Sequence, residues 1–189
     1  MAADGESLLA RVVSSIAQGE PSQDGKNNKS ILSQAAASYA RKPSGAEATI
    51  PTGFDPRAAS LFEAVVEAAF LVANADGEFD EAERETFVKV VHESCANTVQ
   101  AQDVHSLVAD LADLLDEDGV DRRLEMVSSV VQVPEHKLEV LRIAALMAWV
   151  SGGVDDTERI VIEKLAGHFG LPDDDVATTL EQARTALSE

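Results

Sequence analysis

The chain has 189 residues, 45% of them hydrophobic, which is enough for one sizeable core but too few residues for two large domains. Its formal net charge of −19 lies entirely in residues 54–189, which carry ten Lys and Arg against 29 Asp and Glu. So acidic a region repels nucleic-acid phosphates and anionic lipids, which argues against both as partners. It favours cations or basic protein surfaces, or it serves solubility alone.

Cysteine content and apolar run length point to an intracellular, non-membrane protein. Cys95 is the only cysteine, so no intrachain disulfide can form, and its place after an apolar run indicates a small core residue. The longest apolar run, residues 143–150, is about half of what a membrane-spanning helix requires, so we expect no membrane insertion. The N-terminus is acidic where an export signal would be basic, and we therefore expect a cytoplasmic protein.

Residues 1–53 predict a largely flexible arm, because they are rich in Ser, Gln, Asn, Gly and Ala and include three prolines. Within this arm, residues 7–17 and 30–40 each show the spacing of a short amphipathic helix. The two stretches share identical residues at four positions, so the motif is duplicated. Their apolar positions are Leu8, Leu9, Val12, Val13, Ile16, Ile31, Leu32, Ala35 and Tyr39.

Helices this short are marginal in water, so each needs a surface to fold against. One alternative is that both pack onto the chain's own domain. The other is that they are docking peptides for a partner protein, since a second tethered site raises avidity by roughly 10² or more when geometry permits. The shell of a protein compartment is one partner class suggested by analogy, because such shells take up short N-terminal targeting helices.

Residues 54–189 predict an all-α domain of about seven helices, most of them antiparallel to their chain neighbours because the connections are short. The expected domain start is marked by Asp55 and Pro56, a cap residue and a first-turn proline. No stretch alternates as a half-buried strand does. The expected helices cover residues 56–75, 81–94, 102–115, 121–131, 134–149 and 156–169, with a last one from residue 172.

The two ends of this domain repeat each other with an offset of 75 residues. An acidic bend after the first apolar helix, residues 75–84, matches the stretch at 150–159. Four identical pairs precede the bend, four lie within it and one follows it. The repeat predicts two related helix-turn-helix corners, one in each half of the domain.

The residues that carry a family resemblance are Asp76 and Gly77, with Glu83 on the next helix and the closing stretch at 168–171. With them, residues 58–187 resemble the TerB-like family of tellurite-resistance and stress-response helical domains. The resemblance implies a compact helical fold of two related halves, no established catalysis, and a role in cation binding or in assembling stress-response complexes. Ser151 replaces the aspartate in the second corner, which departs from the pattern.

Two interpretations of the first corner stay open. Gly77 suits a left-handed residue at the end of a helix, and Asp80 with Glu83 has the spacing of a capping box, repeated by Asp155 and Glu158. Alternatively, a divalent cation (Ca, Mg or Mn) binds loosely to Asp76, Glu78, Asp80 and Glu83. These residues match part of a calcium-binding loop, but the first ligand position is a valine.

The four histidines lack zinc-ligand spacing, and no nucleophile or phosphate-loop motif is present. We therefore predict a non-enzymatic interaction or adaptor protein of the stress-response class, docked to a partner assembly through its N-terminal arm. The alternative function is a divalent-cation sensor or buffer that uses the acidic corner at residues 76–83.

Overall fold

The computed structural model describes residues 2–19, 29–43, 53–77, 79–151 and 153–188. Within these ranges it contains helices, one isolated bridge between Gln18 and Lys29, and no strand, which confirms the all-helical prediction. In chain order the helices are α1 (Ala2–Ala17), α2 (Ile31–Tyr39), α3 (Pro56–Ala73), α4 (Glu81–Ser94), α5 (Ala101–Asp118), α6 (Val120–Val130), α7 (Pro134–Ala148), the short 3-10 helix η2 (Trp149–Ser151), α8 (Asp156–Phe169) and α9 (Asp173–Ser188).

Local chemistry explains where most of these helices begin and end. Asp55 precedes Pro56, and its carboxylate accepts the backbone N–H of Arg57 at 2.9 Å, so α3 begins where the sequence predicts. Gly170 adopts a left-handed conformation (φ +70°) and ends α8. α5 extends three residues past its predicted end and stops at Gly119, another glycine with positive φ.

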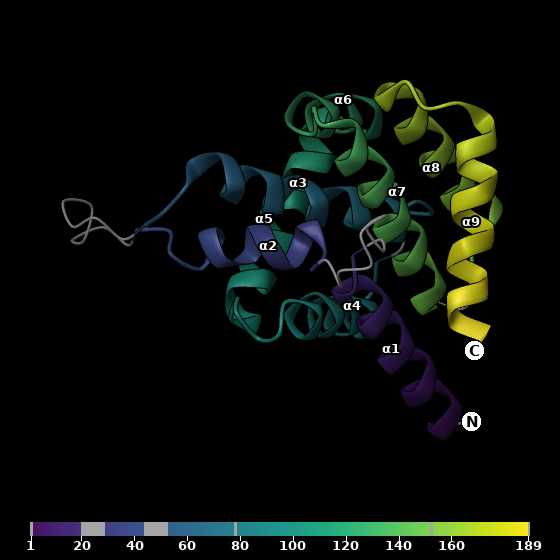
Figure 1. The fold of residues 1–189 in the computed structure, drawn as a ribbon, viewed down its shortest axis with the longest axis horizontal. Coiled ribbons are helices and arrows are strands. Elements are labelled where there is room, and N and C mark those ends of the chain that lie inside the picture. Colours follow the sequence, from purple (N-terminus) through teal and green to yellow (C-terminus); the bar gives the residue numbers. More distant parts are fainter. Residues whose placement is uncertain (1, 20–28, 44–52, 78, 152, 189) are drawn as a thin grey trace.

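The centre of the fold is the pair α3 and α7, the two helices that the 75-residue offset makes equivalent (Figure 1). In α3 every residue from 64 to 72 is buried, and in α7 every residue from 143 to 148 is buried. A helix buried on all sides must lie inside the molecule rather than on its surface. Small residues such as Ala69 and Ala144, both almost fully buried, let the two helices approach closely.

A buried ion pair joins α3 to α6. Arg123 donates to Glu67 at 2.6 Å and to Asp118 at 3.0 Å, and the side chains of Arg123 and Glu67 are only 11% and 9% exposed. Burial raises the pKa of Glu67, while the hydrogen bond from Arg123 opposes that rise. A charged pair in such a place is held by its own hydrogen bonds, since each charge alone would be costly to bury.

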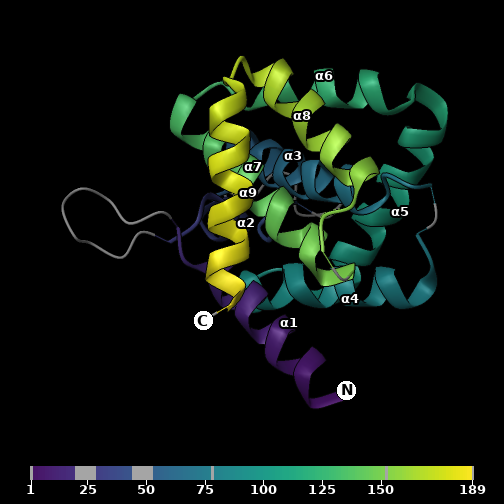
Figure 2. The same cartoon turned by 90° about the vertical axis from the view of Figure 1, so that its right-hand side faces the viewer.

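Both helices of the predicted arm are folded against the domain. α2 packs on α3, and α1 contacts α4, α7 and α9. The N-terminal turns of α1 project beyond the body of the domain in both views (Figures 1 and 2). Within the described ranges, no helix combines the length and the apolar character needed to cross a bilayer.

Candidate functional site

The first corner joins α3 to α4 and has the capping geometry that its sequence predicts. Gly77 has a φ of +80°, in the left-handed region that favours glycine. The carboxylate of Asp80 accepts the N–H of Glu83 at 2.9 Å, and the carboxylate of Glu83 accepts the N–H of Asp80 at 3.0 Å. This capping box satisfies two otherwise unpaired donors of the first turn of α4.

The proposed cation ligands are only partly brought together by this fold. Asp80 and Glu83 are neighbours, but each already uses one carboxylate oxygen in the capping box. Asp76 is exposed, and Glu78 lies outside the described residues. Among the residues that the structure does describe, no group of three or more acidic, His or Cys side chains is arranged to hold a metal. The cation hypothesis therefore stays a prediction for experiment.

The second corner repeats the capping box and strengthens it. Asp155 accepts the N–H of Glu158 at 2.7 Å and also the hydroxyl of Thr157 at 2.7 Å. The backbone N–H of Glu158, followed by the Thr157 hydroxyl, holds the pKa of Asp155 below its usual value. The equivalent of Thr157 in the first corner is Ala82, which cannot supply this bond.

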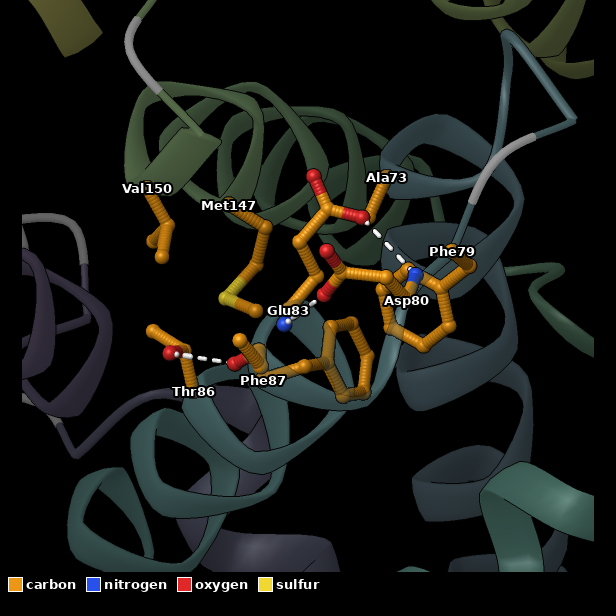
Figure 3. Close-up of a pocket in the computed structure, with 9 residues that line it drawn as sticks. Ala73, Phe79, Asp80, Glu83, Thr86, Phe87, Met147 and Val150 are labelled. Atoms are coloured by element: carbon orange, nitrogen blue, oxygen red, sulfur yellow. Dashed lines mark hydrogen bonds between the residues drawn. The ribbon is translucent and has the colours of Figure 1, made fainter.

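An open pocket of about 190 Å³ lies against the first corner, and we call it the corner pocket. Figure 3 shows side chains from the first turns of α4 facing side chains from the end of α7 and from η2. Its walls are mainly apolar, and the two acidic residues of the capping box, the exposed Asp80 and the half-buried Glu83, also line it; we call these two residues the rim. The lining residues are Ala73, Phe79, Asp80, Ala82, Glu83, Thr86, Phe87, Met147 and Val150.

Three phenylalanines fix one wall of the corner pocket. Phe79 meets Phe70 edge-on with ring centroids 5.4 Å apart, and it meets Phe87 in the same way at 5.9 Å. Phe70 and Phe87 are almost fully buried, so they anchor the half-buried ring of Phe79. Edge-to-face aromatic pairs add about 0.5–1.5 kcal/mol beyond the area they bury. The wall is therefore stiff.

The predicted docking residues of the arm lie on the chain's own domain. Five of them are buried and the other four are half-buried, which is the first of the two alternatives left open by the sequence. Tyr39 packs on the ring of Phe62 with centroids 4.6 Å apart. The buried five are Val12, Ile16, Ile31, Leu32 and Ala35, and the half-buried four are Leu8, Leu9, Val13 and Tyr39.

Two charged side chains of α7, spaced three residues apart, hold the arm in place. Glu139 accepts the N–H of Ile31 at 2.8 Å, so a carboxylate lies at the N-terminus of α2. Arg142 donates to the carbonyl oxygens of Ser15 and Gln18 at 2.9 and 3.0 Å, so a guanidinium lies at the C-terminus of α1. Each charge has the sign that the helix dipole favours. No sequence pattern identifies either residue as an anchor of the arm.

Cys95 has no sign of reactivity. Its side chain is buried, and burial alone raises the pKa of the thiol to about 12, so it is a thiol rather than a thiolate near neutral pH. This confirms the expectation of a core cysteine.

Comparison with known proteins gives one result. Residues 62–181, more than half of the chain, match the family described as "Tellurite resistance protein TerB". No curated protein and no solved structure gives a significant match. The matched range contains both corners, all of α7 and α3 from Phe62 onward, so it covers every residue that lines the corner pocket. The chain belongs to the TerB tellurite-resistance family.

Proposed function

We propose that this TerB-family chain is a non-enzymatic interaction protein that acts in tellurite resistance or a related stress response, and that it reaches a partner assembly through the N-terminal end of α1. Family membership supports the stress-response role. The observation that carries the docking role is the geometry of α1, which is anchored at one end and projects from the domain at the other (Figures 1 and 2).

The anchored end of α1 is its C-terminal half. Val12 and Ile16 are almost fully buried there, and Arg142 binds the last carbonyls. The projecting end has exposed Glu6 and Ser7. A helix held in this way presents a preformed docking segment and avoids most of the ordering cost that an unfolded peptide bears on binding.

Only part of the arm is available for contact with a partner. The apolar side chains of α2 are committed to the core, so α2 positions the arm rather than contacting a partner. In α1, Leu8 and Leu9 are half-buried and lie at the boundary between anchored and projecting turns. We assign the partner contact to these two leucines and the turns before them. A compartment shell is one partner class for such a helix.

The test is a quantitative pull-down from native lysate of tellurite-exposed cells. We expect Leu8→Asp with Leu9→Asp to lose at least one protein that the unchanged chain captures. Because both leucines also pack against the core, capture is compared at a temperature where the melting curve shows the variant to be folded. The matched control is Ala10→Asp with Ser14→Asp, which adds the same charge at two exposed positions of α1. If the leucine variant and the control retain every captured protein equally, the proposal fails.

A further inference from the structure

We propose that the corner pocket is a docking site for a basic amphipathic helix of a partner protein, which inserts one aromatic or branched aliphatic side chain and places Lys or Arg beside Asp80 and Glu83. This site deepens the interaction role proposed above and rests on it. It is separate from the projecting end of α1 and from any cation bound by the first corner.

The size of the pocket selects a single side chain. Its volume is about 190 Å³, whereas sites for drug-sized ligands and cofactors typically span about 300–1,000 Å³. Apolar cavities near 150 Å³ accept a benzene ring. The corner pocket is therefore too small for a nucleotide or a flavin, and it is large enough for one Phe, Leu or Trp side chain delivered from outside.

The depth of the pocket can adapt to the shape of that side chain. Met147 lines the corner pocket and also a small internal void of about 10 Å³. A methionine has three rotatable bonds and fills irregular space easily, so it can shift toward the void when a larger anchor enters. The opposite wall, made by Phe79 and Phe87, is held by the aromatic contacts and should not move.

The rim of the pocket sets the charge of the partner. Asp80 and Glu83 each use one oxygen in the capping box, and among the described residues neither carboxylate forms a salt bridge or a hydrogen bond through its second oxygen. These outer oxygens can accept from Lys or Arg. The surrounding domain is strongly acidic, which speeds the approach of a basic partner and repels an acidic one. An apolar anchor flanked by basic residues is the chemistry that fits both the wall and the rim.

The neighbouring surface is also suitable for a helix. α1 contacts both α4 and η2, the elements that contribute opposite sides of the pocket. The pocket therefore lies among helices, which suits the helix-in-groove mode by which amphipathic helices are recognised.

The test is a display selection of amphipathic helical peptides against the full chain at moderate salt, followed by calorimetry with the enriched peptides. We expect enrichment of peptides with Lys or Arg around one large apolar residue. Changing that residue to Ala should weaken binding about tenfold or more. Ala82→Trp, which fills the mouth of the pocket, should weaken it to a similar degree.

Two matched controls separate the pocket from its surroundings. Ala177→Trp places the same bulk at an exposed position just after the acidic first turn of α9 and should bind as the unchanged chain does. Asp80→Asn with Glu83→Gln removes both rim charges but keeps a cap-forming pair, and should weaken binding several-fold. Asp155→Asn with Glu158→Gln makes the same change outside the pocket and should leave affinity unchanged.

The proposal is overturned if no peptide is enriched, if the enriched peptides are acidic or neutral, or if Ala82→Trp binds them as Ala177→Trp does. Concentration-dependent dimerisation abolished by Ala82→Trp would make a second copy the occupant and would also overturn it. The Leu8 and Leu9 variant should bind the selected peptides normally. Failure of the pocket and failure of the α1 docking role are therefore distinguishable.

Discussion

The two corners share one cap and differ in what surrounds it. In both, an aspartate and a glutamate three residues apart close a capping box. In the first corner the box stands beside three aromatic rings and an open pocket. In the second, Phe70 and Phe79 are replaced by Ala145 and Val154, and a threonine hydroxyl is added to the cap. The second corner thus has the more fully bonded helix start, and the first has the open pocket.

The equivalent helices before the corners differ in the same way. At one position of the repeat α3 has Glu67, which pairs internally with Arg123, and α7 has Arg142, which binds the end of α1. One half uses this position to close the core, and the other uses it to hold the arm. A duplicated fold can therefore keep its backbone plan while the same position makes different contacts in the two halves.

The largest expected effect is at the aromatic cluster. Phe70→Ala should lower the free energy of unfolding by about 3–5 kcal/mol, because Phe70 is almost fully buried and contacts two other rings. Urea denaturation measures this. Val154→Ala, a smaller deletion at the second corner, should cost less. Equal losses for the two variants would show that the aromatic cluster adds nothing particular to the first corner.

The next effect is at the anchor of the arm. Arg142→Ala should cost about 1.5–3 kcal/mol, since it removes charged hydrogen bonds to the end of α1. Hydrogen exchange should show faster exchange in α1, while the α3 amides stay protected. Arg122→Ala is the control, because among the described residues Arg122 forms only an exposed pair with Glu125, and such a pair adds little stability. Uniform loosening of the whole chain would contradict a local anchoring role.

A smaller difference should separate the two caps. Asp80→Ala and Asp155→Ala should each cost about 1 kcal/mol, with the larger loss at Asp155 because it also accepts the Thr157 hydroxyl. Thr157→Ala should reduce the stabilisation that Asp155 provides to about the stabilisation that Asp80 provides in the first corner. The Asn variants should be nearly neutral because Asn also caps helices well. Thermal melting of the set provides the ranking, and a larger loss at Asp80 would reverse the comparison.

The extra hydrogen bond to Asp155 should also change how the stability of the chain depends on pH. The hydrogen bonds to Asp155 lower its pKa in the folded chain, so its contribution to stability is complete above the pKa of the unfolded state and is lost as pH falls through the lower folded value. Asp155→Asn should remove this part of the acid sensitivity, which lies below the ordinary pKa of an aspartate. Melting curves that fall in parallel for both proteins would contradict the assignment.

Helix positions and both capping boxes could be predicted from sequence because their signals are local. Asp80 with Glu83 and Pro56 after Asp55 act within one turn, so spacing alone identifies them. The corner pocket could not be predicted, because Met147 reaches it from a helix more than sixty residues away from Phe79. Which helix faces lie opposite each other depends on packing, which periodicity does not specify.

For the arm, too, the sequence predicts the helix but not the surface that the helix contacts. The spacing of Leu8, Val12 and Ile16 predicted an amphipathic helix, and that helix is present. The spacing of apolar residues could not decide what the apolar face of this helix would contact, because the chain's own domain and a groove on a partner protein would both offer it an apolar surface. The deciding residues, Glu139 and Arg142, lie over a hundred residues away and look like ordinary surface charges in the sequence.

The smallest expected effect concerns the remaining difference between the corners: the first has an aspartate at position 76 where the second has a serine at position 151. If the first corner holds a divalent cation, calcium at a concentration equal to its dissociation constant should add about 0.4 kcal/mol to the free energy of unfolding. Asp76→Ser copies the second corner and should abolish the gain without weakening the cap, which Asp80 and Glu83 form by themselves. Calorimetry with calcium, magnesium and manganese measures the binding. The absence of heat and of any melting shift relative to chelator would remove the cation hypothesis and leave the acidic rim to a basic protein partner.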